Sequence, residues 1–362
     1  MQVNQRLHPL WHLKIMQIFV LGTLVARLVL AFPTPLGSAI GDFVDKGIAK
    51  SHLADVVGTD VPDSAKTYTV VNSKQIEFLK GWVDYAFASY RINSMADDKV
   101  LAKSAFAKNA TLEYVATLDT FPALTVFIAV DRPASMIVVT FRGSDDETLY
   151  NTASRVNLVS LIAPGIGRVF GGAMQGVTKQ GPTIVAKHRE LLQKYPGFRT
   201  YVVGHSLGGL HAVFYSALNA KAILASAKTS DAGDATTKPE NKATTADNHI
   251  PWQVITFACP MEGDKDFSEY YRGLNIPTFS VMNSFDPISY LPTEMLKYTR
   301  AVPRIVVDNH TNQTVQCHST LTNLLARDLC TGRPELSSLS KEYHSAFWGN
   351  DGSHLGAKPN AI

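Results

Sequence analysis

The stretch YVVGHSLGGL, residues 201–210, places Ser206 between two glycines, after three residues that favour a β-strand. A serine at a sharp turn from a strand into a helix presents its hydroxyl for nucleophilic attack. Such a turn has room only where the residues two before and two after lack side chains. Gly204 and Gly208 hold those positions. The pattern predicts a nucleophile elbow in which His205 packs and forms hydrogen bonds; the alternative is a glycine-rich helix start with an N-capping serine.

A serine nucleophile needs a histidine base and an acid that orients the base. In α/β-hydrolase-like chains these follow the serine in the order acid, then histidine. Asp286 lies just past an apolar run that ends at Met282, and strand ends of this kind collect functional groups. Four histidines follow it, and His344, in KEYHSAFWGN, has aromatic neighbours that suit the wall of a site. We predict Asp286 as the acid and His344 as the base; the alternatives are an Asp-Pro turn and a surface histidine.

Nucleophilic attack on a carbonyl also requires hydrogen-bond donors for the negative oxygen that develops. The amide of Leu207, at the predicted helix start, is one candidate donor. Ser144 is the other, because it follows Gly143 at the end of the β-rich run SMIVVTFRGS. An ordinary Arg-Gly-Ser turn is the alternative. We predict an oxyanion hole formed by Leu207 and Ser144.

These residues need a scaffold that brings their segments to one edge of a sheet. Apolar spacing and turn residues predict helices at 75–92 and 176–195, a strand, elbow and helix from 200 to about 227, and strands at 110–118, 124–133, 135–144, 251–260, 276–287 and 302–308. The alternation of strands and helices predicts a mostly parallel sheet flanked by helices. The hairpin within 124–144 should add an antiparallel edge.

Residues 228–248 interrupt this pattern. The segment contains no large apolar residue and no hydrophobic period, so it cannot bury a core, and we expect a disordered insertion. Strand-like runs continue on both sides of it. We therefore expect one α/β domain over residues 32–362.

The N-terminal residues have the character of a targeting segment. Residues 15–32 are apolar apart from Gln17, Thr23 and Arg27, and basic residues precede them. We expect residues 1–31 to be a signal peptide, with an uncleaved signal anchor or an amphipathic surface helix as alternatives. Three N-glycosylation sequons, at residues 109, 309 and 312, and a pair of cysteines that could close a short loop, Cys317 and Cys330, are compatible with secretion.

Composition limits the class of partner. The net charge is +3, 45% of the residues are hydrophobic and 18% are charged, which is typical of a globular protein. No dense stripe of Lys and Arg is present, so we expect no nucleic-acid partner. No spacing typical of a zinc or redox site occurs, so we expect no metal and no cofactor. Nothing in the sequence identifies a protein partner.

Taken in order, the motifs over about residues 110–350 resemble those of the class 3 lipase family of α/β-hydrolases. The matching segments are IVVTFRGS, YVVGHSLGGL, ITFACPMEGDKDF, NSFDPISYLP and HSAFW. The resemblance implies an α/β-hydrolase fold, triad roles for Ser206, Asp286 and His344, and oxyanion roles for Ser144 and Leu207. Cys259 departs from the small residues usual in the family, and the 228–248 insertion is also unusual.

A lid is the element on which substrate class depends most. The resemblance suggests one at residues 145–168, where apolar residues from Val156 to Ile162 suit a short mobile helix with one apolar side. Tyr150 stands where the family usually has a tryptophan. A core helix or a plain loop is the alternative.

The predicted function is hydrolysis of carboxylic esters of lipids by a secreted serine hydrolase that passes through an acyl-enzyme, with acylglycerols as the expected substrates. The partner is then a lipid ester substrate at a lipid–water interface, with transient contact to a membrane surface. A phospholipase or a carboxylesterase for soluble esters is the first alternative. A catalytically silent lipid-binding protein is the second, and tethering through residues 15–32 is the alternative to release.

Overall fold

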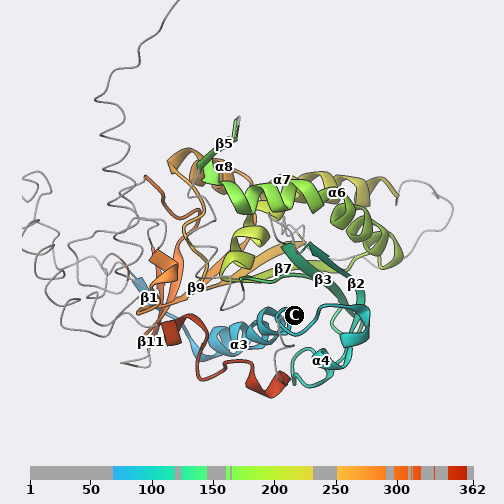
Figure 1. The fold of residues 1–362 in the computed structure, drawn as a ribbon, viewed down its shortest axis with the longest axis horizontal. Coiled ribbons are helices and arrows are strands. Elements are labelled where there is room, and N and C mark those ends of the chain that lie inside the picture. Colours follow the sequence, from blue (N-terminus) through green and yellow to red (C-terminus); the bar gives the residue numbers. More distant parts are fainter. Residues whose placement is uncertain are drawn as a thin grey trace, which may run out of the picture.

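The computed structural model centres on a nine-stranded sheet with helices on both faces (Figure 1). It describes residues 68–118, 124–144, 160–163, 165–230, 251–290, 297–308, 311, 313–318, 330 and 341–356. The predicted signal segment at 1–31 lies outside the described residues, as do 231–248 of the predicted insertion and 145–159 of the predicted lid. Helix α7 continues to Ser230, so the first three residues of the predicted insertion are helical.

The sheet has parallel strands in the middle and antiparallel strands at both margins. Its order is β1-β11-β10-β9-β8-β7-β4-β3-β2. The strands are β1 (Tyr68–Val70), β2 (Ala110–Leu118), β3 (Leu124–Asp131), β4 (Met136–Phe141), β7 (Arg199–His205), β8 (Trp252–Phe257), β9 (Thr278–Asn283), β10 (Arg304–Asp308) and β11 (Gln313–Cys317). Parallel pairs join β4, β7, β8, β9 and β10. The predicted parallel sheet and its antiparallel β3–β4 hairpin are confirmed.

The second antiparallel margin, β11 and β1, was not predicted from the sequence. Strand β11 reads QTVQC and β1 has only three residues, so neither contains a long apolar run. Pairing with β10 holds β11 in place, and β1 pairs with β11. Pairing with neighbouring strands, more than their own composition, therefore makes these segments β-strands.

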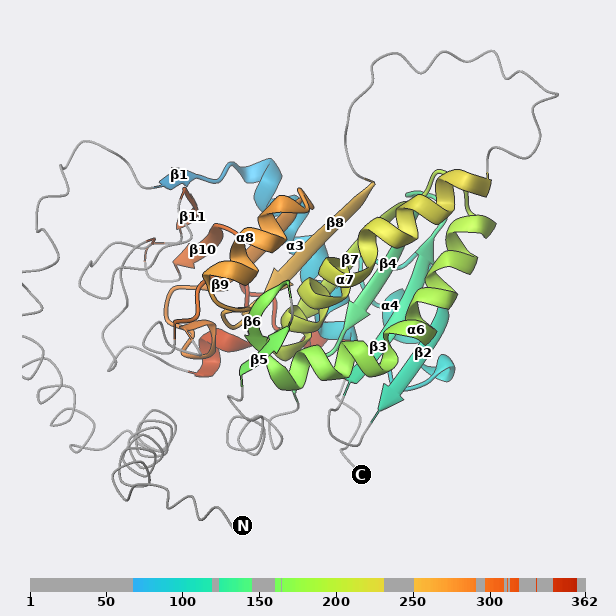
Figure 2. The ribbon, with the colours of Figure 1, turned by 90° about the horizontal axis from the view of Figure 1, so that it is seen from above.

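Helices cover the two faces of the sheet unequally (Figures 1 and 2). On one face lie α6 (Gly171–Lys194), α7 (Leu207–Ser230) and α8 (Lys265–Gly273). On the other lie α3 (Ser73–Ala88), the short α4 (Lys99–Ala102) and the C-terminal segment. The described residues also form the 3-10 turns η2 (Met95–Asp97), η4 (Ile288–Tyr290), η7 (Lys341–His344) and η8 (Ser353–Leu355).

Helix α6 begins five residues earlier than predicted. Its first residues, GGAM, have poor helix propensity because of the glycines, which is why the sequence pattern placed the start at residue 176. Gly171, Ala173 and Met174 are buried, so packing against the rest of the protein stabilises this first helical turn although its residues are poor helix formers.

The helix predicted within the lid segment is wrong at Leu161 and Ile162, which lie in a strand. Strand β5 (Ser160–Ala163) pairs antiparallel with β6 (Gly167–Phe170) as a separate two-stranded sheet. Gly165, with φ of 73°, lies between the two strands. The apolar run therefore enters a hairpin, in which pairing with β6 outweighs the helical spacing of its residues.

Alternate residues of the central strands supply two separate cores. Val126, Ile128 and Val130 of β3 join the cluster beneath α6, α7 and α8. Phe127 and Ala129, which point the other way, join the cluster beneath α3 and the C-terminal segment. The strands are apolar on both sides, as expected of a sheet that is covered on both faces.

A disulfide fixes the margin of the sheet near β11. Cys317 and Cys330, which are 13 positions apart, are joined with a Cα–Cα distance of 5.4 Å, as the sequence suggested. Cys259 is free and buried. The bond ties the end of β11 to the chain that leads toward His344.

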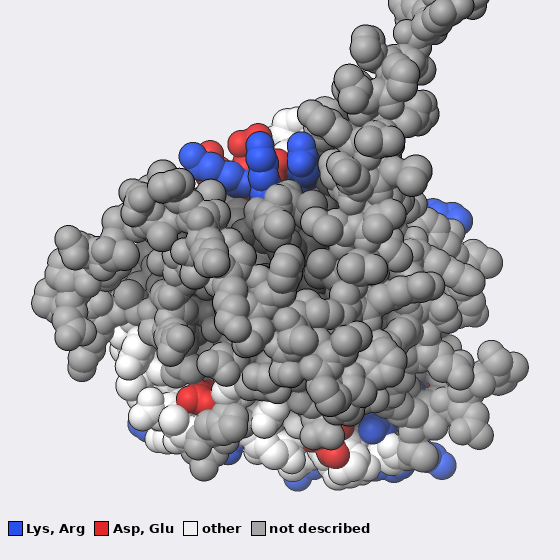
Figure 3. All heavy atoms as spheres, turned by 60° about the vertical axis from the view of Figure 1, so that its left-hand side comes forward, with Lys and Arg blue, Asp and Glu red and all other residues white. Residues whose placement is uncertain are grey.

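Charged side chains of both signs lie next to one another at the upper edge of the view in Figure 3. Ion pairs on the surface include Lys265–Glu269 in α8, with 3.6 Å between Nζ and Oε1. This mixture agrees with the small net charge of the whole chain. Across the part of the chain that the structure describes, we find no helix with the length and apolar character of a membrane span.

Candidate active site

A sharp turn joins β7 to α7 at Ser206. The strand ends at His205, the helix begins at Leu207, and Ser206 itself has φ of 56°. A Cβ on Gly204 would lie 2.1 Å from the carbonyl oxygen of Gly208, and one on Gly208 would lie 2.2 Å from that of Phe141. These contacts are with backbone, so the two positions exclude every residue that has a side chain. Both glycines are therefore explained by the geometry of the turn.

Strand β4 ends beside this turn. A Cβ on Gly143 would lie 3.0 Å from the Cβ of Ser206, and Ser144 follows as a half-buried residue. Leu207 is the first residue of α7, and the first amides of a helix have no acceptor within the helix. The structure thus brings the end of β4 and the start of α7 to the serine, as an oxyanion site requires.

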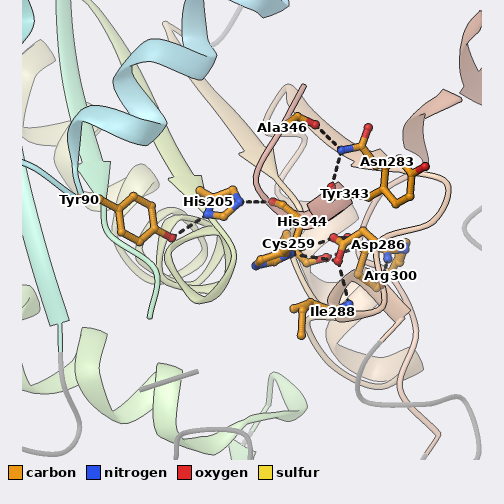
Figure 4. Close-up of polar contacts among 11 residues, drawn as sticks. Tyr90, His205, Cys259, Asn283, Asp286, Ile288, Arg300, Tyr343, His344 and Ala346 are labelled. Atoms are coloured by element: carbon orange, nitrogen blue, oxygen red, sulfur yellow. Dashed lines mark hydrogen bonds and ion pairs between the residues drawn. The ribbon is translucent and has the colours of Figure 1, made fainter. Parts of the chain in front are cut away.

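Asp286 and His344 form a buried pair (Figure 4). His344 Nδ1 lies 3.0 Å from Oδ1 of Asp286 and 3.1 Å from its Oδ2. Asp286 is fully buried, and it follows β9 by three residues. Burial alone raises the pKa of this carboxyl, but the charge of His344 and the hydrogen bonds together bring the pKa below its ordinary value of 3.8. The acid is therefore held as a carboxylate.

Two further donors fix the orientation of this carboxylate. The Ser289 hydroxyl donates to Oδ2 over 2.5 Å, and the amide of Ile288 donates to Oδ1 over 2.9 Å. Ser289 was not predicted from the sequence. Its spacing, three residues after Asp286 across an Asp-Pro turn, is the signal that could have identified it, because a short 3-10 turn brings positions i and i+3 together.

The far ring nitrogen of His344 is available as a base. Because Nδ1 donates to the carboxylate, Nε2 of the neutral ring carries a lone pair. Nε2 is buried and has no hydrogen-bond partner among the residues that the structure describes. The imidazole lies 4.8 Å, between ring centroids, from that of His205, the residue before Ser206. The predicted acid and base are thus in contact, and the base lies beside the elbow.

His205 itself forms hydrogen bonds through both ring nitrogens, as the sequence analysis expected of a packing residue. Within the described parts of the chain, no group of three or more His, Cys, Asp or Glu side chains is placed to hold a metal ion. The site therefore consists of a buried carboxylate–imidazole pair beside the turn that carries Ser206.

Comparisons with known proteins point to one family. The family model described as lipase (class 3) matches residues 138–296. Secreted mono- and diacylglycerol lipase A of Penicillium cyclopium, and that of Penicillium camembertii, are each 24% identical over 260 residues, which are 68% of this chain and 74% of theirs.

Solved structures of fungal lipases share the fold. The Rhizomucor miehei lipase propeptide complex superposes with a TM-score of 0.60 at 18% identity, over 81% of this chain and 91% of that one. A lipase from Rhizopus microsporus var. chinensis superposes with a TM-score of 0.59 at 18% identity, over 82% and 97%. The chain is similar to the class 3 lipase family over residues 138–296, has the α/β-hydrolase fold and is a carboxylic ester hydrolase.

Proposed function

We propose that this enzyme hydrolyses ester bonds of acylglycerols, with Ser206 as nucleophile, His344 as base and Asp286 as the acid that orients the base. The observation that carries the proposal is the buried Asp286–His344 pair. The Nε2 of His344 has no hydrogen-bond partner among the described residues, and its imidazole ring lies beside that of His205, the residue before Ser206. Support for the substrate class comes from relatives named as mono- and diacylglycerol lipases and as a triacylglycerol lipase.

In the first half of the reaction the Ser206 hydroxyl oxygen attacks the ester carbonyl, and its proton passes to Nε2 of His344. The carboxylate of Asp286 stabilises the imidazolium that forms. The amide of Leu207 and a donor of Ser144 bind the negative oxygen of the tetrahedral intermediate. His344 then gives the proton to the alcohol oxygen as the carbon–oxygen bond breaks, which leaves an acyl-enzyme.

In the second half of the reaction, water hydrolyses the acyl-enzyme with the help of the same residues. His344 removes a proton from a water molecule, the water oxygen attacks the acyl carbon, and the proton returns to Ser206 as the fatty acid leaves. No electron transfer occurs in either half. The chain's own hydroxyl, imidazole and carboxylate supply each proton transfer.

An extracellular place of action is part of the proposal. The Penicillium relatives are named as secreted, and the Cys317–Cys330 disulfide suits an oxidising compartment. The substrate would then be met at a lipid–water interface. N-terminal sequencing of the mature protein checks this: a start near Phe32 means release by signal cleavage, whereas retention of Met1 means a tether.

Labelling with a fluorophosphonate probe tests the nucleophile. The wild-type enzyme should be labelled at one site, and Ser206→Ala should lose both labelling and ester hydrolysis while its melting temperature stays close to wild type. Ser216→Ala is the matched control, because Ser216 is a buried serine of α7, the helix that follows Ser206, and accepts a hydrogen bond from Trp252 Nε1. Equal labelling of Ser206→Ala and wild type would overturn the assignment.

A substrate panel then tests the ester class. Emulsified mono-, di- and triacylglycerols, phospholipid vesicles and a soluble p-nitrophenyl ester should be compared at equal enzyme concentration. We expect the highest rate on an acylglycerol. A higher rate on the phospholipid would make the enzyme a phospholipase, a higher rate on the soluble ester would make it a carboxylesterase, and no turnover of any ester would support the silent lipid-binding alternative.

A further inference from the structure

The turn that carries His344 is held through its main-chain carbonyl oxygens. Asn283, the last residue of β9, is fully buried, and its Nδ2 donates to the carbonyl oxygens of Tyr343 over 2.5 Å and Ala346 over 2.6 Å (Figure 4). A side-chain amide nitrogen has two hydrogens, so both are used here. The two bonds fix the chain on either side of the base.

His205 holds the carbonyl between those two. Its Nε2 lies 2.7 Å from the carbonyl oxygen of His344, and its Nδ1 lies 2.6 Å from the hydroxyl of Tyr90 (Figure 4). A carbonyl oxygen can only accept, so Nε2 carries the proton. In the neutral ring Nδ1 then accepts from the Tyr90 hydroxyl. Tyr90 therefore sets the tautomer in which His205 can hold the turn.

The two residues that hold the turn, His205 and Asn283, each lie close in the sequence to another residue of the proposed triad. His205 precedes Ser206, and Asn283 lies three residues before Asp286. Strands β7, β8 and β9 are parallel, so the ends of β7 and β9 lie on the same edge of the sheet. The same two strand ends thus position the nucleophile, the acid and the turn that carries the base. Any small shift of one strand end moves a donor together with its catalytic neighbour.

We propose that His205 and Asn283 are positioning residues for the base, which set the place of His344 by binding the backbone of residues 343–346. The proposal rests on the role proposed above for His344. Neither side chain has to touch the substrate. A displacement of a reacting group by about 1 Å can cost 10²-fold in rate. Loss of either donor should therefore lower kcat and leave KM almost unchanged.

The test compares variants that remove the donor with variants that keep one. In His205→Phe and Asn283→Leu the donor is lost, and we expect kcat on a soluble ester to fall by about 10- to 100-fold. KM should change less than twofold, and the rate of fluorophosphonate labelling should fall in parallel with kcat. His205→Gln keeps an amide donor that can reach the carbonyl, so it should recover most of the loss.

His188→Gln is the matched control for a purely structural effect. His188 is also fully buried and also bonded through both ring nitrogens, to Tyr215 and Thr200, but it lies on α6. Its replacement should lower the melting temperature and leave kcat per folded molecule unchanged. If His205→Phe lowers kcat only as much as the control does at equal folded fraction, the positioning role is overturned.

Two further measurements keep the outcome decisive. Tyr90→Phe removes the donor to Nδ1 of His205 without altering the turn directly, so it gives a smaller fall in kcat even where His205→Phe does not fold. The downfield proton resonance of a histidine Nδ1–H bonded to Asp286 should move in Asn283→Leu and stay in His188→Gln. An unmoved resonance with an unchanged kcat overturns this inference alone, whereas wild-type labelling of Ser206→Ala or His344→Ala overturns the proposed function.

Discussion

Two buried histidines on either side of Ser206 have opposite surroundings. His205, at the end of β7, is hydrogen-bonded through both ring nitrogens. His211, in the second turn of α7, has no partner for either nitrogen among the described residues, and its ring lies near Phe141. Both are almost fully buried, so burial does not distinguish them.

The contrast extends to the regions around the two side chains. The side of α3 and the C-terminal segment contains Tyr90 and the buried Asp84, which accepts from Ser104 and Asn350. Both sides have an apolar cluster, and on the side of α6, α7 and α8 the buried His188 bonds to Tyr215 and Thr200, not to the turn of His344. Hydrogen bonds have strict distance and angle requirements, whereas apolar burial is not directional. We infer that the first region sets the geometry of the site and the second stabilises the fold.

Asp286→Asn should give the largest effect. An amide keeps the shape of the carboxylate but removes its charge and favours the wrong tautomer of His344, so kcat should fall by about 10⁴-fold. Because the pKa of Asp286 is lowered, its charge stabilises the fold above pH 4 and loses this effect as the pH falls further. The free energy of unfolding of the variant should therefore lack this loss below pH 4. Steady-state kinetics and urea unfolding at pH 3 to 7 measure both effects, and an unchanged kcat would contradict the role of the acid.

Removing the disulfide should lower stability without lowering activity. In Cys317→Ser/Cys330→Ser the unfolded chain regains the freedom of a short loop, which costs about 3 kcal/mol of stability. The turn at His344 has its own bonds to Asn283 and His205, so kcat per folded molecule should stay within about twofold. Denaturant unfolding with and without reductant gives the stability. A large fall in kcat would show that the margin of the sheet, and not the strand ends, positions the base.

His211→Leu should alter stability in acid and leave catalysis unchanged. Burial lowers the pKa of His211 to about 4 from its ordinary value of 6.5. As the pH falls from 6.5 toward 4 the unfolded chain binds a proton that the folded chain does not bind, so stability falls, by about 2 kcal/mol at pH 5. Leucine removes this loss.

Unfolding at pH 5 and pH 8 checks the prediction for His211. The difference in free energy of unfolding between the two pH values should be smaller in the variant than in wild type. His188, whose pKa burial lowers to about 3, keeps its own acid dependence in both proteins and so serves as an internal reference. An identical pH dependence in both proteins would show that His211 binds no proton on unfolding.

His354→Ala should have the smallest effect. His354 Nε2 lies 3.3 Å from Asp84 Oδ1, but its side chain is 44% exposed, and exposed pairs contribute about 1 kcal/mol or less. Asn350→Ala removes a shorter, half-buried bond to the same carboxylate and should cost more. Melting temperatures of the two variants measure the order. The reverse order would mean that charge, and not the geometry of the hydrogen bond, holds the C-terminal segment.

The central strands and the elbow could be predicted because their residues carry the pattern themselves. Long runs such as LTVFIAV are apolar on both sides, as a covered strand must be, and Gly204 and Gly208 are required by contacts within a short turn. Strand β11 and the β5–β6 hairpin could not be predicted in this way. These strands are short, and the spacing of their apolar residues does not distinguish a strand from a helix. Pairing with a neighbouring strand decides their structure.

The bonds that hold the base could not be read from the sequence for a different reason. His205 and His344 are 139 positions apart, and Asn283 and Tyr343 are 60 apart. In each case the acceptor is a backbone carbonyl, which every residue type provides. The residue type at the acceptor position therefore does not reveal that such a bond exists. The Asp286–His344 pair could be proposed because both of its ends are side chains.

The turn that carries His344 is held by hydrogen bonds to its backbone, so its side chains are not needed to hold it in place. Tyr343 and Ala346 offer only their carbonyl oxygens to Asn283, and the Tyr343 ring packs beside Phe285 at 5.4 Å between centroids. Replacing these two side chains need not displace the imidazole between them. Residues 343 and 346 are thus positions where natural or laboratory selection can change a side chain while the Asp286–His344 pair keeps its geometry.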